Sequence, residues 1–489
     1  MKKRIPALLI SSILAFGVAG SLTACGDNFN GITVNFWHTF GKTPLGAIEG
    51  YAKSFAKLVK ENEDVNVRIK FSYKGGYGDM TGVITKAFAT GDNPTIAVAY
   101  PDHVAEYFAA ESKPGEYVVN LEPYMNDSEI GFGKESWLGD KYGAEDFVQS
   151  FFEEGESYAK EGVYSLPYMK SSEVMFYNMT ALRKVMPEYN GMTSDVEIQS
   201  FMNDLDWETL MDLCEYVADN KSTIISKLET PCFYDSDGNF IITKMMQRNI
   251  GYASIDASGV ASLDFDGIEN DSTPEQISNY NKTIALLNEL KGYVDDGFLT
   301  TKAVYGEYGS NQFVNQKTMF SIGSSGGAGY NLPTTKTFEV GVCKVPYDNN
   351  NPVYVTQGPT LCMLNNTKMA SEDNKLCVKY GWKFLKYITN GEANADLCVN
   401  GSEGYIPVRE SAYSTSTFLN FLEKGEDYAK VAKVVINDIN GEYFNTPVFT
   451  GSAALREYIA GALGDTLTGK LSAKDALDNA ISETVKKMA

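Results

Sequence analysis

Aromatic and carboxylate side chains stand where three predicted strands end. The strand-like segments 32–37, 65–71 and 94–100 each end at, or shortly before, such a group. Parallel α/β sheets bind ligands beyond the carboxyl ends of their strands. Rings placed there can stack on a ligand, and hydroxyls and carboxylates can hydrogen-bond to it. The pattern predicts a binding edge formed by Trp37, His38, Tyr77, Tyr100 and Asp102.

Two of these residues have a plainer interpretation. Trp37 also fits a core position, and Asp102 also fits the N-cap of a helix over 104–110. Both alternatives stay open.

A second polar group lies within 164–178, which reads YSLPYMKSSEVMFYN. Val174 to Tyr177 predicts a short buried strand after Lys170-Ser171-Ser172-Glu173. Serines in such a turn could direct hydroxyls into a cleft, because their short side chains favour turns. The alternative is an ordinary turn between two core strands.

A third group is the strand and loop over 318–331, TMFSIGSSGGAGYN. It lacks the lysine of a nucleotide-binding P-loop. Its glycines would let the backbone approach a ligand, and N–H groups at a helix start could hold ligand oxygens. The alternative is a flexible connector.

Motifs for catalysis and metal binding are weak. No G-x-S-x-G motif occurs, although 63 Asp and Glu leave a glycosidase-type carboxylate pair open. Asp235 and Asp237 begin like a calcium loop, but the third ligand position and the later Glu are missing. Two histidines, His38 and His103, are too few for a histidine metal site. We therefore expect no metal, no cofactor and no catalysis.

The elements that must position these groups alternate between strand and helix over 32–110. This order predicts a parallel, doubly wound α/β sheet. Residues 233–242, FYDSDGNFII, predict a hairpin turning at Asp235 to Asn239. Helices are predicted at 45–59, 77–90, 104–110, over most of 180–219, and at 280–294 and 377–388. A further helical region runs from 452 to the end, with a break near Gly469. Strands are predicted at 340–346 and 353–364.

The start of the chain predicts export. Positive residues 2–4 precede a short apolar run, and Leu22-Thr23-Ala24-Cys25 resembles the lipobox of bacterial lipoproteins. By that resemblance residues 1–24 are a signal peptide, Cys25 carries acyl chains, and 25–31 form a tether. The alternative is an ordinary signal peptide cut elsewhere. No other apolar run approaches a spanning length, so we expect a protein held at the extracellular membrane face by lipid alone.

Charge and cysteine content restrict the partners. A net charge of −21 argues against nucleic acid, which needs a basic face. Disulfides are possible outside the cell, but no spacing assigns a pair. Besides Cys25 the cysteines are Cys214, Cys232, Cys343, Cys362, Cys377 and Cys398.

Several short pieces together resemble the bacterial extracellular solute-binding proteins, the sugar-binding family of ABC importers. The likeness runs from residue 32 to the C-terminus and is nearest to the members that bind glycerol 3-phosphate. Each piece is weak, and their order and spacing carry the resemblance. The pieces are FWHTFG (36–41), YKGGY (73–77), FATGDNPTIAVAY (88–100), LPYMKSSEVMFYN (166–178), GSSGG (323–327), QGPTL (357–361), GYIPVRESAY (404–413) and TGKLSAKDALDNAISE (468–483).

The resemblance implies an α/β, periplasmic-binding-protein-like fold of two lobes, each a doubly wound sheet flanked by helices. Several hinge crossings would join the lobes, with 164–178 as one crossing beside the ligand. The implied ranges are 32–176 and 346–402 for the N-terminal lobe, and 177–345 and 403–489 for the C-terminal lobe.

Carried over by position, the family's ligand contacts fall on Tyr77, Ser171, one of Ser324 and Ser325, Gly358 and Tyr405. The tyrosine rings could stack on a sugar, the serines could donate hydrogen bonds, and glycine would let the backbone come close.

Two departures from the glycerol-3-phosphate binders affect the expected ligand. Their carboxylate contact after the third strand is matched only by Asp102, one residue later. Their phosphate-binding arginine is not found at Val448 to Gly451, and Arg456 comes later. Arginine is the natural partner of phosphate, so its absence and the acidic charge favour a neutral carbohydrate.

The expected function is a monomeric substrate-binding lipoprotein that closes its lobes on a sugar or oligosaccharide and delivers it to an ABC permease. The alternatives are a binder of glycerol 3-phosphate or a glycerophosphodiester, a secreted glycoside hydrolase, and a sensory or adhesive surface protein.

Overall fold

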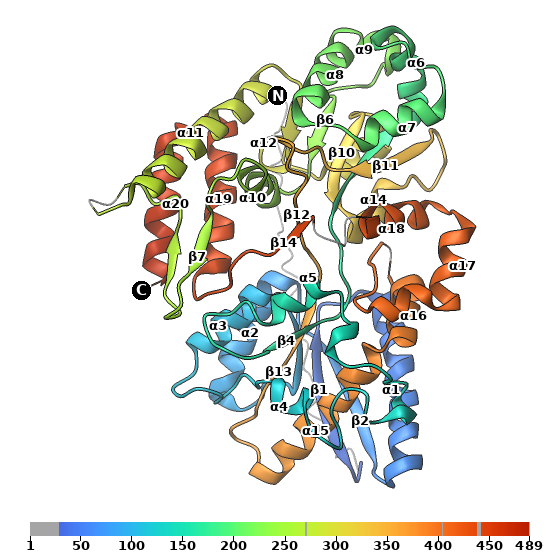
Figure 1. The fold of residues 1–489 in the computed structure, drawn as a ribbon, viewed down its shortest axis with the longest axis vertical. Helices are drawn as coiled ribbons and strands as arrows, with labels where there is room; N and C mark the ends of the chain where they lie inside the picture. Colours follow the sequence, from blue (N-terminus) through green and yellow to red (C-terminus); the bar gives the residue numbers. More distant parts are fainter. Residues whose placement is uncertain (1–28, 269–270, 403, 438–441, 489) are drawn as a thin grey trace, which may run out of the picture.

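Two five-stranded sheets organise the chain in the computed structural model, which describes residues 29–268, 271–402, 404–437 and 442–488. Figure 1 shows one sheet in each of two lobes, with helices around both. The predicted signal peptide, the acylated Cys25 and the tether up to residue 28 lie outside the described residues.

The first sheet has the order β2-β1-β3-β13-β4. β1 pairs in parallel with β2 and β3, as predicted, whereas β13 runs antiparallel to both β3 and β4. The strands are β1 (Ile32–His38), β2 (Val67–Tyr73), β3 (Ile96–Ala99), β4 (Ser165–Pro167) and β13 (Thr360–Met363), and the helices packed around them are α1 (Lys42–Glu63), α2 (Tyr77–Thr90), α3 (Pro101–Ala109), α4 (Glu122–Met125), α5 (Gln149–Phe152), α15 (Ser371–Ile388), α16 (Gly391–Gly401) and α17 (Ser416–Lys424).

The second sheet has the order β11-β5-β10-β6-β9. β5 runs antiparallel to β11 and β10, while β10, β6 and β9 are parallel. Its strands are β5 (Glu173–Asn178), β6 (Cys232–Tyr234), β9 (Leu299–Thr301), β10 (Phe320–Ser324) and β11 (Val340–Lys344). Its helices are α6 (Met179–Tyr189), α7 (Asp195–Asn203), α8 (Trp207–Asp219), α9 (Lys221–Ile224), α10 (Asp237–Gln247), α11 (Pro274–Asp295), α12 (Lys302–Tyr305), α13 (Gly309–Val314), α14 (Ala328–Asn331), α18 (Asp427–Asn437), α19 (Ser452–Leu467) and α20 (Ala473–Met488), and a small hairpin is formed by β7 (Ala253–Ile255) and β8 (Ala261–Leu263).

The hairpin predicted over 233–242 is wrong. β6 ends at Tyr234 and α10 begins at Asp237. The Ser236 hydroxyl accepts a hydrogen bond from Asn239 N at 3.3 Å, and an acidic residue in the first turn suits the helix dipole. Polar residues that suit a turn therefore form a helix start.

The chain passes between the sheets at 168–172, which joins β4 to β5, and at 345–359, which joins β11 to β13. The second crossing contains β12 (Tyr354–Val355), which pairs with β14 (Tyr443–Phe444) near the centre of Figure 1. Sheet membership alone does not assign every helix to a lobe, so the lobe ranges stay a prediction.

The apolar core follows this division. One cluster of buried residues packs β6 and β10 of the second sheet against α8, α10 and α19. A second cluster fills the first lobe and continues through Tyr168, Met169 and Val174 to the other face of the second sheet. The 168–172 crossing is thus anchored in the core.

Cysteine state and membrane crossing can be reported for the described residues. The six cysteines other than Cys25 are buried, free thiols. None of the helices within the described ranges combines the length and apolarity that crossing a membrane requires.

Candidate functional site

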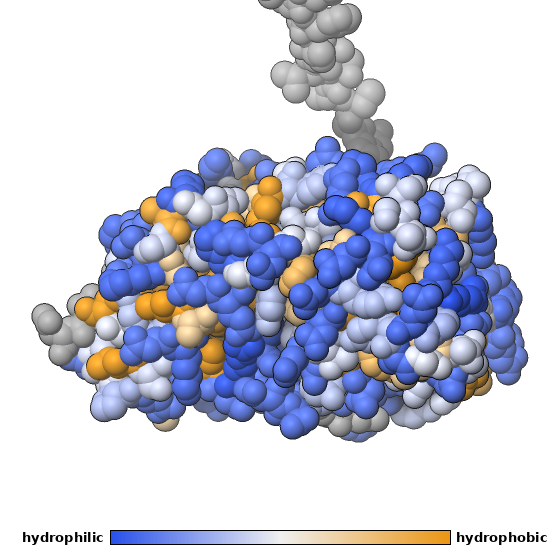
Figure 2. Space-filling view, turned by 90° about the horizontal axis from the view of Figure 1, so that it is seen from above, coloured by the Kyte–Doolittle hydropathy of each residue, from blue (hydrophilic) through white to orange (hydrophobic). Residues whose placement is uncertain are grey.

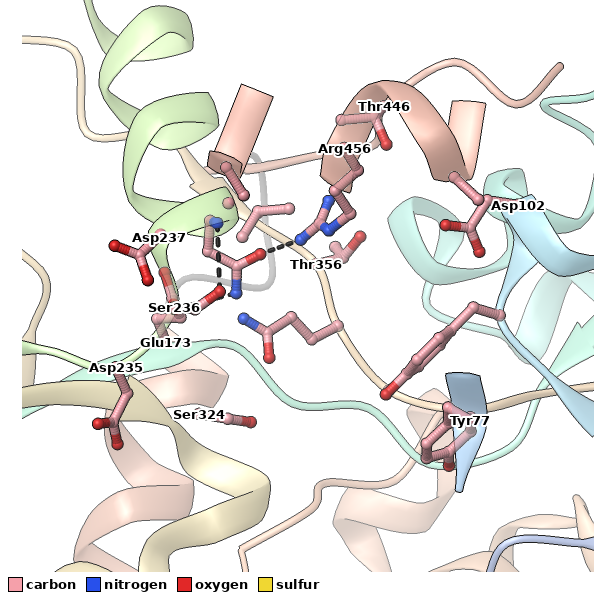
Figure 3. A pocket seen from close by; sticks show the side chains of 18 of the residues that line it. Tyr77, Asp102, Glu173, Asp235, Ser236, Asp237, Ser324, Thr356, Thr446 and Arg456 are labelled. Atoms are coloured by element: carbon pink, nitrogen blue, oxygen red, sulfur yellow. Dashed lines mark hydrogen bonds between the residues drawn. The ribbon is translucent and has the colours of Figure 1, made fainter. Parts of the chain in front are cut away.

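A cavity of about 1020 Å³ lies between the two lobes. The starts of α2 and α3 form one wall, the 235–239 segment and α19 form the opposite wall, and the crossing segments lie between them. Figure 3 shows Tyr77 and Asp102 on the right, Ser236 and Asp237 on the left, and Arg456 between them.

The first wall presents two stacked rings beside a carboxylate. The rings of Tyr77 and Tyr100 lie 4.2 Å apart at 19°. Burial raises the pKa of both phenols, so at neutral pH both hydroxyls keep their protons and can donate. The wall thus offers a flat aromatic surface with donors and one acceptor group, Asp102.

The predicted capping role of Asp102 is wrong. α3 begins at Pro101 with Tyr100 as its N-cap, and Asp102 lies in the first turn. Its Oδ1 accepts a hydrogen bond from the backbone N of His103 at 2.9 Å. The carboxylate remains partly exposed in the cavity lining, so it can accept further hydrogen bonds.

The second wall contains a hydrogen-bonded relay. Arg456 Nη2 donates to Asn239 Oδ1, and Asn239 Nδ2 donates to Glu173 Oε1 at 2.9 Å. The Tyr234 hydroxyl donates to the other Glu173 oxygen. Burial raises the pKa of Glu173 to about 7, although these hydrogen bonds and the nearby Arg456 oppose the rise. A guanidinium is thereby tied, through an amide, to a buried carboxyl group.

Two further carboxylates beside this wall, Asp235 and Asp237, accept hydrogen bonds from neighbouring segments. Asp235 accepts from Gly309 N at 2.5 Å, and Asp237 accepts from the Thr301 hydroxyl at 2.5 Å. Burial raises the pKa of both, that of Asp235 to about 6. Their oxygens are therefore partly occupied by structural bonds.

The floor of the cavity is a buried ion pair. Lys170, on the first crossing, pairs with Glu154. The same carboxylate accepts from the hydroxyl of Thr356 on the second crossing, and that hydroxyl lies 2.5 Å from Asn445 Oδ1. One network thus links the two crossing segments to Glu154 and Asn445.

The charged groups around the cavity are mostly acidic. Because carboxylates outnumber lysine and arginine side chains by six to three, the lining is a poor environment for an added anion. The carboxylates are Asp102, Glu154, Glu173, Asp235, Asp237 and Glu457, and the cations are Lys170, Lys302 and Arg456.

Five of the sequence-predicted residues line the cavity: Tyr77, Tyr100, Asp102, Ser324 and Gly358. Their contact with a ligand stays a prediction. Gly358 has a φ of 116°, and a Cβ there would lie 2.3 Å from the carbonyl oxygen of Met169. Its lack of a side chain therefore lets two crossing segments pack closely.

The other five predicted residues lie behind the lining. Trp37 and His38 are buried in β1; Lys74 Nζ sits 3.9 Å from the Trp37 ring centre, and His38 Nδ1 accepts from Phe40 N. Neither residue is part of the cavity lining, and the burial of Trp37 fits its core alternative.

Ser325 belongs to the Gly/Ser loop (323–327), and Ser171 and Tyr405 pack beside it. Ser171 exchanges backbone hydrogen bonds with Gln357, and Ser325 N donates to Ser172 O at 2.8 Å. The Tyr405 ring packs against the Cα of Gly326, where a Cβ would come within 2.7 Å of it. These residues position the loop that carries Ser324.

Sequence reasoning missed Arg456, Asn239, Glu173 and Glu154. Arg456 was noted only as lying beyond the expected arginine position, yet Ser452, Arg456 and Ala460 share one face of α19 and all line the cavity. Their spacing of four residues in a predicted helix is the signal that could have found Arg456. For Glu173 no local signal exists, because its partners are distant in the sequence.

Metal binding has no support in this region. The described residues contain no group of three or more His, Cys, Asp or Glu side chains arranged to hold a metal ion.

Comparison with known proteins gives the family. The model of the bacterial extracellular solute-binding proteins matches residues 51–423. The chain belongs to that family. It is 23% identical over 492 residues to the sn-glycerol-3-phosphate-binding periplasmic protein UgpB of Escherichia coli K12, covering 97% of this chain and 96% of that one.

Solved structures of sugar and glycerophosphodiester binders share the two-lobed fold. The GacH receptor of Streptomyces glaucescens, studied unliganded and with acarbose, has a TM-score of 0.64 at 15% identity, covering 93% of this chain and 98% of that one. UgpB of Mycobacterium tuberculosis, in complex with glycerophosphocholine, has a TM-score of 0.63 at 14% identity with the same coverage. At these identities the likeness shows the fold alone, and the predicted fold class is confirmed.

Proposed function

We propose that this solute-binding protein captures a neutral carbohydrate, a sugar or an oligosaccharide, by closing its lobes around the cavity. The observation that carries the proposal is the stacked Tyr77–Tyr100 pair beside the Asp102 carboxylate in one cavity. An aromatic face suits the apolar side of a sugar ring, and a carboxylate suits its hydroxyls.

The size and charge of the cavity support the same ligand class. A volume of about 1020 Å³ is at the upper end of small-molecule sites, which leaves room for more than one sugar unit. The acidic excess in the lining disfavours a phosphate, whereas a neutral polyol adds no charge to it.

A second candidate is glycerol 3-phosphate or a glycerophosphodiester. Arg456 favours it, because a guanidinium lines the cavity although the sequence predicted no arginine there. The descriptions of UgpB from two organisms, one as a glycerol-3-phosphate-binding protein and one in complex with glycerophosphocholine, also favour this candidate. The acidic surroundings of Arg456 place this candidate second.

Delivery and anchoring complete the proposal. We infer that the protein hands its ligand to an ABC permease, acts as a monomer, and is held at the extracellular membrane face by acyl chains on Cys25. A labelled-palmitate incorporation assay with Cys25→Ala as control tests the anchor: wild type should be labelled and the variant should not.

Binding can be tested with the purified mature chain by calorimetry against maltotriose, mannotriose, cellotriose, glycerol 3-phosphate and glycerophosphocholine. The proposal expects one-to-one binding of a neutral oligosaccharide and recovery of that sugar unchanged. Binding of the phosphorylated compounds alone would favour the second candidate, and release of smaller sugars would favour a glycoside hydrolase.

A further inference from the structure

We propose that Glu173 sets the preference of this cavity for neutral over anionic ligands, by offsetting the charge of Arg456 through Asn239. The inference rests on the proposed function, because it explains how a cavity that contains an arginine can favour an uncharged sugar. It makes Glu173 a specificity-determining residue that need not touch the ligand.

The relay fixes the guanidinium in place. Among the described residues, Asn239 supplies the hydrogen bond that Arg456 makes. The Asn239 amide can have its oxygen toward Arg456 only because its nitrogen has an acceptor on the opposite side, Glu173 Oε1 at 2.9 Å. Tyr234 holds the second carboxylate oxygen. The orientation of Arg456 thus depends on the buried Glu173 carboxylate, to which it is linked by two successive hydrogen bonds through Asn239.

The relay also fixes the local charge. All three residues line the cavity; Arg456 is partly exposed, whereas the Glu173 and Asn239 side chains are buried. A carboxylate joined to a guanidinium through one amide and shielded from solvent cancels much of the attraction that an incoming phosphate or sulfate would feel. The affinity for ligands with hydroxyl groups is reduced little, because the guanidinium still donates hydrogen bonds to them.

A neutral side chain at this position is compatible with folding. Burial already raises the pKa of Glu173 to about 7, so the uncharged acid is a normal state of the folded protein. Glutamine keeps an acceptor for Asn239 and the same shape. Glu173→Gln therefore removes a charge with little change in packing.

The test measures dissociation constants for sn-glycerol 3-phosphate and maltotriose at about pH 8, where Glu173 is mostly ionised. Glu173→Gln should bind glycerol 3-phosphate at least about tenfold more tightly than wild type, because one nearby unit charge has been removed. Its affinity for maltotriose should change less than about threefold. Unchanged or absent binding of glycerol 3-phosphate by Glu173→Gln would overturn the inference.

Two variants show whether the effect passes through Arg456. Adding Arg456→Gln to Glu173→Gln should remove the gain; a gain that persists would overturn the inference. Glu208→Gln makes the same change in net charge at an exposed position of α8 outside the lining, and should change neither affinity. A tenfold gain in Glu208→Gln would assign the effect to overall charge instead. Failure of maltotriose to bind any variant counts against the proposed sugar alone.

Discussion

The two walls of the cavity are built in different ways. The first wall is local: Tyr77 begins α2, Tyr100 caps α3, and Asp102 follows two residues later. The second wall is assembled from β5, α10 and α19, whose side chains form the Glu173–Asn239–Arg456 relay. A wall made of helix starts offers fixed shape, whereas a wall made of a polar relay offers adjustable charge.

This difference assigns a task to each wall. Flat rings and one carboxylate give affinity for a hydroxylated ligand without depending on a network. The relay gives selectivity, because the ionised Glu173 carboxylate offsets the positive charge of Arg456. At the floor, Glu154 pairs with Lys170 of the first crossing and accepts a hydrogen bond from Thr356 of the second.

The largest effect is expected at the floor of the cavity, on the stability of the fold. Glu154→Gln should lower the free energy of unfolding by about 3 kcal/mol or more, because it leaves the Lys170 ammonium buried without its counter-ion. Urea denaturation measures this. Replacing both partners, as Lys170→Met with Glu154→Gln, should recover part of the loss. Equal stability of wild type and Glu154→Gln would contradict the role given to the floor.

On the first wall, Tyr100→Ala should weaken binding of the neutral ligand about thirtyfold, as expected for a central aromatic contact in a desolvated site. Tyr100→Phe keeps the ring and should lose less than about fivefold. Calorimetry of both variants measures the difference. Similar losses in both would mean that the hydroxyl, and not stacking, matters.

Asp102→Asn should weaken the same ligand about tenfold, because a hydrogen bond to a charged acceptor becomes a neutral one. The variant keeps the side-chain shape and should leave the melting temperature within a few degrees. If Asp102→Asn bound the ligand as tightly as wild type, the carboxylate would not contribute to binding.

On the second wall, lowering the pH from about 8 to about 6 should strengthen binding of glucose 6-sulfate by about fivefold. Protonation of Glu173, whose pKa is about 7, removes negative charge beside Arg456, and a sulfate ester keeps its own charge over this range. Tyr234 stays protonated throughout because burial raises its pKa, while Asp235, with a pKa of about 6, adds to the change at the acid end. Glu173→Gln should show a markedly flatter profile, and a profile equal to that of wild type would be evidence against the relay.

The smallest effect is expected at Trp37. Trp37→Phe should change affinity less than about threefold, because the ring is buried in β1 behind the lining. It should lower stability instead, as a core truncation does. A large loss of affinity without loss of stability would instead show that Trp37 contacts the ligand.

The contrast between the walls also explains what the sequence could predict. Alternating patterns over 32–110 gave β1, α1, β2 and α2 because each depends on neighbouring residues. For the same reason Tyr77, Tyr100 and Asp102 were placed near a ligand site from pattern alone. The strand β13 lies within the predicted strand 353–364, but its antiparallel pairing with β3 and β4 was not predicted. The helix α10 was not predicted, since polar residues at 235–239 suit both a turn and a helix start.

The second wall needed the structure. Glu173 and Arg456 are separated by almost three hundred residues of chain, and only the fold brings Asn239 between them. Gly358 shows the same limit: no local pattern predicted that Met169, on the other crossing, leaves no room for a side chain there. Residues whose role depends on distant partners cannot be read from local patterns.

The most direct test of the account is a crystal structure of the mature chain with the neutral oligosaccharide that binds best. The account predicts a sugar ring against Tyr77 and Tyr100, a hydroxyl at Asp102, and contacts to the Arg456 wall from the other lobe. A sugar bound outside the cavity, or held by one lobe alone, would contradict it.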